Sequence, residues 1–594
     1  MPFDGLVLAA VTKELEEKLV GGRVERIYQP SKDEIILLMH RQGFRGRLIL
    51  SANAQNARVH LTTSARENPA SPPLFCMVLR KYLEGGRVIG IEQPELERVF
   101  LMRIESRDEL GNPSPKHLIC ETMGKHSNII LLDPLNNSIV DGIKRYSHAV
   151  SRYREVLPGR EYLFPPRQKK LNPYQVDEEQ FRLACLKLPL ETTLPALLQK
   201  CLGGMSTVTC REIVFRANLS PDTILDQCGD YEFSSLWRAF REFIVPAGKG
   251  CFEPCLTSST KGRFVDFAAI DLAHTGLMRK KGEMNFLLDL FFSEYEKGER
   301  IQKEKKIILS LLNKEINKLG KKLALHTKGL DETAEAGKLK LYGELLTANI
   351  YRLEKGIREV SLENYHENGP EVVTIPIDPH RSPAENAQLY FKKYLKSKNT
   401  RLALMSQITR TRELLEYVEG VKTAVEQTGA IADLEEIKQE LIEQGFIKQP
   451  LTSSVRKKKM EKHKPVFLSF LSSEGFQLFA GKNNRQNDFL TLKFARENDL
   501  WLHTKDIPGA HVIIRTEGKE VPQTTLMEAA SLAAFFSKAR ESGNVPVDYT
   551  RIKYVSKPKN ARPGMVVYER QKTIMGAPDG ELVERLIIVN NKED

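Results

Sequence analysis

Long apolar runs are missing from this sequence of 594 residues. The N-terminal run at residues 6–11 is short, follows Asp4 and leads into Lys13 and Glu14, so it does not resemble a secretory signal with its basic start. No stretch approaches the roughly 18 apolar residues that a membrane-spanning helix needs. We therefore expect a cytoplasmic protein that does not enter a membrane.

Cysteine is scarce and confined to the first half of the chain. The eight cysteines are Cys76, Cys120, Cys185, Cys201, Cys210, Cys228, Cys251 and Cys255. They show no repeated close pairs, which predicts reduced and mostly buried thiols. Cys251 and Cys255 come nearest to a metal half-site, but zinc needs about four ligands and no second Cys or His pair follows at a suitable spacing. We expect neither a metal site nor a cofactor.

Sequence signatures of catalysis are also missing. There is no phosphate-binding glycine loop, no nucleophile elbow, no His-Glu metal helix and no glycine-rich dinucleotide turn. His503 and His511 allow a metal or acid–base interpretation, but no clear third ligand or nucleophile accompanies them. Histidines that are hydrogen-bonded in a sheet or that face RNA are the preferred interpretation. We therefore expect a protein without catalytic residues that is not an enzyme.

Positive charge is in excess. The chain has 89 Lys and Arg against 77 Asp and Glu, a net charge of +12, and 41% of its residues are hydrophobic. This composition is typical of a globular basic protein, and its charge favours polyanionic partners. At about 150 residues per domain, the length predicts roughly three to five domains.

Residues 1–173 are predicted to form an α+β domain. Apolar strands alternate with polar turns, and amphipathic helices are expected over 6–19 and near 75–83. The expected strands lie at 23–28, 34–39, 47–50, 99–104 and 128–132. A block of prolines and cationic residues at 164–173 ends the domain, because it can continue neither a strand nor a helix.

Residues 174–275 show short helical patterns, over 188–198 and 209–217. Between them, Gly203 and Gly204 precede a capping residue, Ser206 or Thr207. A helix-hairpin-helix unit would explain this order, and its backbone amides can hold a phosphate at a helix N-terminus. An ordinary helix boundary explains the same glycines, and on this signal alone it is the preferred interpretation.

Residues 276–447 contain two long helical patterns. In the first, apolar residues recur at alternating spacings of three and four, at Leu309, Leu312, Ile316, Leu319 and Leu323. The second keeps the same seam, which includes Ile408 and Val418. This pattern predicts an antiparallel coiled-coil hairpin with a small lobe at its tip. Ser382 begins the second helix as an N-cap, with a proline after it and Glu385 three residues on. Forty helical residues span about 60 Å, which suits a reach across something large.

A basic segment separates the hairpin from the last domain. Six of the nine residues from 456 to 464 are Lys or Arg, a density that keeps a chain extended until it meets negative charge. We assign residues 448–464 as a basic linker. A solubilising linker and an RNA contact explain this segment equally well.

The most informative stretch lies in the last domain, at residues 481–514. Polar, turn-forming and aromatic residues are dense there, and strands are predicted at 490–494 and 511–514, so the polar groups are expected on loops beside a sheet. A helix is expected over 526–540, followed at 549–572 by interleaved cations and aromatic residues. Trp501 could stack on a base or close the core, and the core is slightly preferred.

This stretch resembles the RNA-binding domain of the NFACT family. Residues 1–5 (MPFDG), 73–81 (PLFCMVLRK) and 121–128 (ETMGKHSN) resemble the family's N-terminal domain, and the segment that begins at Ser382 matches its signature for the second long helix. The resemblance spans nearly all of the chain.

By this resemblance, the N-terminal domain is similar to formamidopyrimidine-DNA glycosylases. Those enzymes attack with an N-terminal proline that a glutamate assists, and here Pro2 is present but Phe3 takes the acid's place. Their C-terminal zinc finger is also missing, because no cysteine follows Cys255. The resemblance therefore implies a scaffold that grips nucleic acid without excising bases.

The patterns and the resemblance together predict a multi-domain α+β protein. We expect a glycosylase-like N-terminal α+β domain over 1–173, a helix-hairpin-helix domain over 174–275, a long antiparallel coiled-coil hairpin with a tip lobe over 276–447, the basic linker over 448–464, and a C-terminal α/β RNA-binding domain over 465–594.

The resemblance also implies site residues. The family's acidic–basic pair, commonly Asp-Arg, falls on Glu97 and Arg98, and the arginine can fork onto a phosphate or a base edge. Without the resemblance, an exposed ion pair at a strand end is the preferred interpretation. The residues expected to bind tRNA are Glu97, Arg98, Asp4, Glu121, Thr122, Met123 and Lys125, with Arg80 and Lys81 as further phosphate contacts. The residues expected to bind RNA in the last domain are Asn484, Arg485, Asn487, Asp488, Trp501, His503, Lys505, His511, Lys557 and Lys559.

The implied function is ribosome quality control. The resemblance implies that the protein binds large ribosomal subunits obstructed by peptidyl-tRNA, through rRNA and a protein at the stalk base. It also implies recruitment of alanyl-tRNA for untemplated alanine tailing of the stalled chain, with bonds made by the ribosome and a small RNA-binding co-factor as a further partner. The alternative is a fibronectin-binding surface adhesin, disfavoured by the lack of a signal peptide or anchor. A DNA-processing enzyme is excluded by Phe3 and the missing zinc finger.

Overall fold

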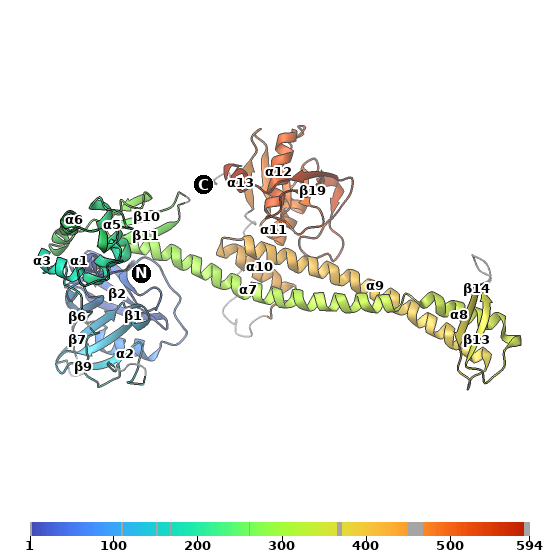
Figure 1. Ribbon diagram of the computed structural model, residues 1–594, viewed down its shortest axis with the longest axis horizontal. Coiled ribbons are helices and arrows are strands. Elements are labelled where there is room, and N and C mark those ends of the chain that lie inside the picture. Colours follow the sequence, from blue (N-terminus) through green and yellow to red (C-terminus); the bar gives the residue numbers. More distant parts are fainter. Residues whose placement is uncertain are drawn as a thin grey trace. The chain divides into compact units, whose positions relative to one another are not determined.

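The computed structural model describes residues 3–107, 111–149, 153–166, 168–260, 262–364, 371–448 and 467–586. The chain divides into two compact units, Met1–Gly298 and Glu299–Asp594, and each is described by itself. The predicted mixture of helices and sheets in several domains is confirmed (Figure 1). Among the helices of these residues, none is long and apolar enough to cross a membrane.

The first unit contains a nine-stranded antiparallel sheet in the order β4-β3-β2-β1-β5-β6-β7-β8-β9. Its strands are β1 (Arg23–Ser31), β2 (Glu34–Arg41), β3 (Phe44–Ser51), β4 (Arg58–Thr62), β5 (Arg87–Glu92), β6 (Val99–Arg107), β7 (Pro113–Glu121), β8 (Asn128–Asp133) and β9 (Ser138–Gly142). The helices α1 (Gly5–Leu19) and α2 (Leu74–Leu83) pack their apolar faces into one core with the sheet. The predicted positions of both helices are confirmed.

The helices that follow extend this core. They are α3 (Glu178–Cys185), α4 (Leu194–Cys201), α5 (Thr207–Arg216) and α6 (Asp230–Gly248). Ser206 caps α5 as predicted, with its side chain accepting a hydrogen bond from the Thr209 backbone. The helix predicted from residue 188 begins only at Leu194, because a proline suits its first turn and Pro189 lies in the preceding turn.

A small sheet lies where the sequence predicted only helices. Strands β10 (Cys255–Ser258), β11 (Phe264–Ala268) and β12 (Met278–Lys281) pair in the order β11-β10-β12. Each strand has only four or five residues, too few for a clear alternation of apolar and polar residues. Cys255 is buried in β10 and Cys251 is exposed, so the two cysteines do not share one environment.

Helix α7 (Met284–Glu332) begins in the first unit, and its residues 284–298, the root of the helix, pack there through a buried charge network. Arg58, only 1% exposed, pairs with Glu34 at 3.4 Å and with Glu296, and its guanidinium lies 4.4 Å from the centroid of the Phe292 ring. Arg66 contacts the same two carboxylates. These paired charges tie the start of the long helix to strands β2 and β4.

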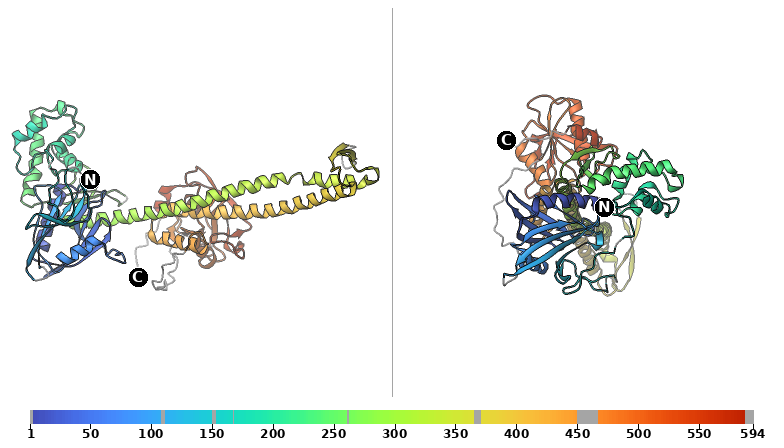
Figure 2. Two further views of the ribbon diagram at one scale, coloured as in Figure 1. Left: turned by 90° about the horizontal axis from the view of Figure 1, so that it is seen from below. Right: turned by 90° about the vertical axis from the view of Figure 1, so that its left-hand side faces the viewer.

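The second unit is built on an antiparallel helical hairpin (Figure 2, left). Helix α9 (Pro383–Gln427) returns along α7, and the predicted seam residues Leu312, Leu319 and Val418 are buried between them. The predicted cap at Ser382 is confirmed, since its side chain accepts from Glu385 and the Glu385 carboxylate accepts from Ser382. A third helix, α10 (Ile431–Glu443), was not predicted separately and completes this core.

The tip of the hairpin carries the predicted small lobe. It consists of α8 (Ala336–Ala348) and the paired strands β13 (Glu359–Asn364) and β14 (Glu371–Pro376). Leu346, Ile375 and Tyr390 form its buried core, and the Tyr390 hydroxyl donates to the carbonyl of Pro376. The lobe therefore has its own apolar contacts and closes the end of the two long helices.

The last domain is a six-stranded antiparallel sheet in the order β15-β16-β18-β17-β19-β22. The strands are β15 (Leu468–Leu471), β16 (Gln477–Ala480), β17 (Leu500–Thr504), β18 (Val512–Ile514), β19 (Val545–Arg551) and β22 (Lys572–Gly576). Helix α12 (Gln523–Phe535) covers one face, and the short helix α13 (Gly580–Leu586) packs with it. A separate pair, β20 (Val555–Ser556) with β21 (Val567–Tyr568), lies in the region predicted as a basic aromatic tail.

The strand predicted at 490–494 is wrong. Asn483 caps a short helix, α11 (Asn484–Phe489), and the chain continues from it in a π-helical turn over Leu490–Phe494. This turn buries Leu490 and packs Phe494 against Phe467 with ring centroids 4.7 Å apart. The apolar residues alternate with polar ones as in a strand, but the Asn483 cap and the contact between Phe494 and Phe467 favour a helical turn.

Candidate nucleic-acid interfaces

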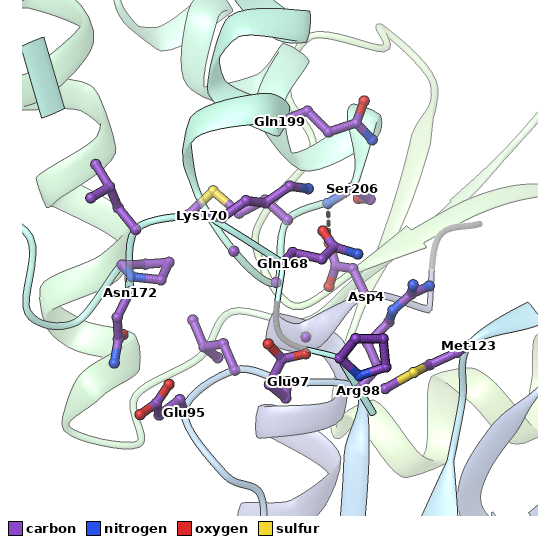
Figure 3. Close-up of a pocket in the computed structure, with 18 residues that line it drawn as sticks. Asp4, Glu95, Glu97, Arg98, Met123, Gln168, Lys170, Asn172, Gln199 and Ser206 are labelled. Atoms are coloured by element: carbon purple, nitrogen blue, oxygen red, sulfur yellow. Dashed lines mark hydrogen bonds between the residues drawn. The ribbon is translucent and has the colours of Figure 1, made fainter. Parts of the chain in front are cut away.

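The first site is a cavity of about 270 Å³ that contains the predicted pair Glu97 and Arg98 (Figure 3). Two consecutive residues before the pair, Glu95 and Leu96, have φ values of +48° and +58°. Left-handed backbone in non-glycine residues costs free energy and is concentrated at functional sites. The loop is therefore held in an unusual shape directly before the residues it presents.

Two glycines let this loop approach the helices behind it. A Cβ atom on Gly5 would lie 2.1 Å from the Leu96 carbonyl oxygen, and one on Gly204 would lie 2.7 Å from the Leu96 Cβ. The Gly5 backbone N–H donates to the Gly204 carbonyl at 2.8 Å. Glycine is required here because any side chain would push the loop away.

Hydrogen bonds fix the backbone of the pair. The Gln93 side-chain amide donates to the Glu97 carbonyl at 2.8 Å and to the Gly5 carbonyl at 2.9 Å. The Thr122 backbone N–H and hydroxyl both donate to the Arg98 carbonyl, at 2.9 and 3.2 Å. These bonds hold the main chain and leave the two side chains available.

The Glu97 and Arg98 side chains line the cavity, and within the described part of the chain neither makes a hydrogen bond or an ion pair. Lys170 lies at the same cavity, and burial, with Arg98 adding to it, lowers the pKa of its ammonium. Two cations, Arg98 and Lys170, thus share this polar space with the carboxylates of Asp4, Glu95 and Glu97, and the cations can bind a phosphate or a base edge there. Figure 3 shows Gln168 and Gln199 at the same space.

The structure brings together four of the predicted tRNA contacts, Asp4, Glu97, Arg98 and Met123. Asp4 is mainly a structural residue here, because its buried carboxylate caps α1 and accepts from the Ser206 backbone at 2.8 Å (Figure 3). Burial raises the pKa of this carboxyl.

Glu121 lies away from the cavity. Its side chain is 0% exposed and accepts hydrogen bonds from Arg154 at 2.7 Å and from the Tyr162 hydroxyl at 2.9 Å. Thr122 is also buried, where it holds Arg98, and Lys125 is exposed beyond the cavity. Thr122 thus supports the backbone of Arg98, and neither Glu121 nor Thr122 lines the cavity.

Lys170, Gln168 and Gln199 were missed by the sequence reasoning. Two of them belong to the block at 164–173, which was interpreted only as the end of a domain. Its density of cations was the available signal, but nothing in the order of residues places it opposite Glu97.

The second set of predicted residues lies in the last domain, where many polar groups of the 481–488 stretch are already paired. The carboxylates of α10 receive most of these donors. Asn483 and Gln486 donate to Glu436 at 2.8 and 2.9 Å, Asn484 donates to Glu440 at 3.0 Å, Lys482 pairs with Asp433 at 3.2 Å, and Arg485 pairs with Glu443. The predicted placement of these polar groups on loops is therefore wrong for residues 484–488, which lie in α11.

Two further predicted residues also have structural contacts. Asn487 is 3% exposed, and its side-chain carbonyl accepts from the His511 backbone at 3.1 Å. Asp488 pairs with Lys557 and accepts from the Gly564 backbone at 3.0 Å. Asn487 and Asp488 fix neighbouring loops to one another, and Lys505 and Lys559 remain exposed.

Asn484, Trp501, His503 and His511 line a second hollow, of about 260 Å³. Trp501 is 0% exposed, which agrees with the preferred core interpretation. Nδ1 of the His511 ring lies 2.7 Å from the Thr491 hydroxyl, and the two share a hydrogen bond. His511 is also buried, and burial lowers its pKa well below the usual value. Burial lowers the pKa of His503 to about 4. Both rings are neutral at physiological pH.

No group of three or more potential metal ligands occurs within the described ranges. The basic segment at 456–464 lies outside those ranges.

Comparison with known proteins identifies the family. Residues 4–462 match the family model of the NFACT N-terminal and middle domains, and residues 466–570 match that of the NFACT protein RNA binding domain. The chain belongs to the NFACT family.

Several NFACT relatives resemble the chain. The "Rqc2 homolog RqcH" of Bacillus subtilis is 38% identical, over 99% of this chain and 100% of that protein. The human "Ribosome quality control complex subunit NEMF" is 28% identical over 22% of this chain and 11% of its own length. The solved N-terminal part of the fibronectin/fibrinogen-binding protein from Streptococcus suis is 31% identical and covers 49% of this chain and 99% of that structure, with a TM-score of 0.41.

Proposed function

We propose that this NFACT protein is a ribosome quality-control factor that recruits tRNA, specifically alanyl-tRNA, to obstructed large ribosomal subunits. In this proposal it directs untemplated addition of alanines to the C-terminus of the stalled chain, which marks that chain for degradation. The protein is not an enzyme in this scheme, because the ribosomal peptidyl-transferase centre forms the bonds. In this proposal the protein acts in the cytoplasm. A small RNA-binding co-factor of alanine tailing is a further expected partner.

The Glu97 and Arg98 side chains in their cavity carry the proposal, because neither is paired with another residue that the structure describes. An arginine with no protein partner within the described residues, beside Lys170, is suited to bind a phosphate or a guanine edge. Glu97 can accept from a base amino group or orient the arginine. The chain is similar over 99% of its length to a protein named as an Rqc2 homolog. This similarity supports ribosome quality control as the function, in preference to other roles that involve RNA.

The other parts of the chain have separate roles in the proposal. The hairpin of α7 and α9 gives reach, since the 45 residues of α9 span about 68 Å at 1.5 Å per residue. We assign to it the contacts with rRNA and with a protein near the stalk base. The RNA-binding domain would add a second grip on tRNA or rRNA.

The test is RNA sequencing after crosslinking in cells to the wild-type protein and to the double variant Glu97→Ala/Arg98→Ala. We expect alanine tRNA and large-subunit rRNA with the wild type and a loss of the tRNA with the double variant. The loss of a bidentate arginine corresponds to about 1–3 kcal/mol, roughly 5- to 150-fold in affinity.

Arg107→Ala is the matched control for this test. Arg107 is exposed at the opposite end of β6, so its loss should change no tRNA signal. If the double variant still recruits alanyl-tRNA and tails stalled chains at the normal rate, Glu97 and Arg98 do not make the contact. Binding to fibronectin without any recovered ribosomal RNA would favour the adhesin instead.

A further inference from the structure

The hollow beside Trp501 has no assigned ligand in the function proposed above. It lies on the face of the six-stranded sheet that α12 does not cover, because Leu500 and Leu502 of β17 pack towards α12 and Trp501 packs with a different cluster. Part of helix α9 borders it, with Glu416, Tyr417 and Gly420 among its lining residues. All of these residues belong to the second unit.

Aromatic rings form one wall of this hollow. The Trp501 ring has its centroid 4.8 Å from that of Tyr568, 5.2 Å from that of His511 and 5.7 Å from that of His503. All four residues line the hollow. Trp501 and His511 are buried, so the half-buried rings of His503 and Tyr568 are the ones that offer π-faces and edges to another flat ring, and every nucleobase has a π-face.

One hydrogen-bond donor in this wall has no partner. The indole Nε1 of Trp501 is buried and makes no hydrogen bond within the described part of the chain. A buried donor without a partner costs about as much as a lost hydrogen bond, so such groups are rare, and a bound water or a ligand would satisfy this one. A base carbonyl or ring nitrogen is an acceptor of the right kind.

Carboxylates stand at the rim of the hollow. Glu416 and Asp506 both line it and are exposed, and neither makes an ion pair with a residue that the structure describes. Partial burial, and then the nearby Asp506, raise the pKa of the Glu416 carboxyl. Two carboxylates repel a phosphate and attract amino groups, so the rim selects against the backbone of a nucleic acid and for a donor on a base.

The size of the hollow limits the occupant. Its 260 Å³ lies just below the range of about 300–1,000 Å³ that is usual for drug-sized ligands. A single heterocycle suits it better than a stacked pair or a peptide segment. Its histidines are neutral at physiological pH, so they add no positive charge that would draw in a phosphate.

We propose that the hollow formed by Trp501, His503, His511 and Tyr568 binds one unstacked RNA base that carries an exocyclic amino group. The base lies against the aromatic wall, its amino group donates to Glu416 or Asp506 at the rim, and its sugar and phosphates stay outside. This deepens the proposed function, on which it rests for an RNA ligand, by naming what the C-terminal domain recognises. Adenine, cytosine and guanine meet the requirement and uracil does not, because uracil has carbonyl oxygens in place of an exocyclic amino group.

The chain offers a built-in reporter for a test. It has only two tryptophans, so Trp237→Phe leaves Trp501 as its sole tryptophan. Trp237 lies in α6, where it packs on Phe181, and phenylalanine keeps an aromatic ring there. Full-length Trp237→Phe protein is titrated with tetranucleotides of adenosine, cytidine or uridine and with an abasic tetramer, and Trp501 fluorescence is followed. We expect saturable changes with adenosine and cytidine, about tenfold weaker binding of uridine, and no change with the abasic tetramer.

Substitutions at the rim test the selection without altering the wall. The double variant Glu416→Gln/Asp506→Asn should reduce the preference of adenosine over uridine to about twofold or less. Asparagine at 506 suits the backbone, because Asp506 has a φ of +54° and asparagine adopts this region readily. Glu413→Gln, one helical turn from Glu416 on α9 and exposed, is the matched control and should keep the full preference.

The outcomes separate this inference from the proposed function. The Glu97→Ala/Arg98→Ala variant should lose tRNA recruitment and keep the tetranucleotide response of Trp501. Glu97 and Arg98 lie in the first unit, whereas Trp501 lies in the second. Tyr568→Leu should weaken adenosine tetramer binding by about 5- to 150-fold, and urea unfolding checks that the variant is folded. An equal response to the abasic tetramer, or a preference for adenosine that survives the rim variant, would overturn the base site.

Discussion

Asp4 and Thr209 are joined by a hydrogen bond of 2.9 Å, in which the threonine hydroxyl donates to the Asp4 carboxylate. The same carboxylate accepts from the Ser206 backbone at 2.8 Å and from the Val7 backbone at 2.9 Å. One buried side chain therefore joins the first turns of α1 and α5. Because Gly5 and Gly204 support the Leu96 loop at this point, Asp4 also fixes one wall of the cavity that contains Glu97 and Arg98.

Replacing Asp4 by alanine should lower the free energy of unfolding of the first unit by about 2–4 kcal/mol. Loss of an N-cap costs about 0.5–2 kcal/mol, and each buried donor left unpaired costs about 1–3 kcal/mol. Urea unfolding followed by Trp237 fluorescence in a Trp501→Phe background measures the change. Asp177→Ala is the control, because Asp177 caps α3 with an exposed side chain and should cost only about 1 kcal/mol. Equal losses in the two variants would show that Asp4 is an ordinary cap.

Alanine at Gly204 should weaken tRNA binding by about tenfold or more. Gly204 has a φ of +71°, and its added Cβ would lie 2.7 Å from the Leu96 Cβ, so the loop before Glu97 must shift or the backbone must strain. Gly203→Ala is the matched control, since its Cβ would meet only the Leu171 carbonyl oxygen at 3.5 Å, an ordinary contact. Filter binding with alanyl-tRNA compares the two variants. The loop is not held by Gly204 if both variants bind like the wild type.

Replacing Arg58 by methionine should destabilise the root of α7. Methionine keeps the apolar stem but leaves the Glu34 and Glu296 carboxylates with Arg66 alone, and breaking a buried ion pair costs about 3–5 kcal/mol. Hydrogen exchange of residues 284–298 should become faster. Arg45→Met provides the comparison, because its ion pair with Glu25 is exposed and contributes about 0–1 kcal/mol. Unchanged exchange in Arg58→Met would show that Phe292 packing alone anchors the helix.

Regular elements could be predicted from the sequence because local signals determine them. The apolar faces of α1 and α9 repeat over many turns, and the Ser382 cap uses neighbouring residues only, so no distant contact is needed to find them. The strand predicted at 490–494 failed for the opposite reason. Its helical turn depends on Phe467 and Phe479, whose rings hold Phe494 from elsewhere in the sequence.

The sites were predicted in part, for a similar reason. Glu97 and Arg98 were proposed through the family resemblance, and the structure adds Lys170, which lies far along the chain and reaches the cavity only through the fold. Polar residues of the 481–488 stretch have the composition of a binding loop. Their partners on α10, such as Glu436 and Glu440, cannot be read from that composition, so paired and free groups look alike in the sequence.

The stability of the C-terminal domain should depend on pH. Burial lowers the pKa of His503 to about 4, and that of His511 well below the ordinary 6.5. Below pH 6.5 the unfolded chain therefore binds protons that the folded domain does not bind, so stability is complete above pH 6.5 and falls as the pH decreases towards 4. For His503 alone the loss at pH 5 is about 2 kcal/mol.

Urea unfolding of the Trp237→Phe protein between pH 7.5 and 5.0, followed by Trp501 fluorescence, measures this loss in the C-terminal domain. His503→Gln should remove part of the pH dependence, because glutamine does not titrate and cannot be protonated in the unfolded chain. His380→Gln is the matched control, since His380 is exposed near the hairpin tip and should leave the profile unchanged. A domain whose stability is the same at pH 7.5 and pH 5.0 would mean that His503 and His511 accept protons in place, without unfolding, and that the aromatic wall of the hollow tolerates a charged ring.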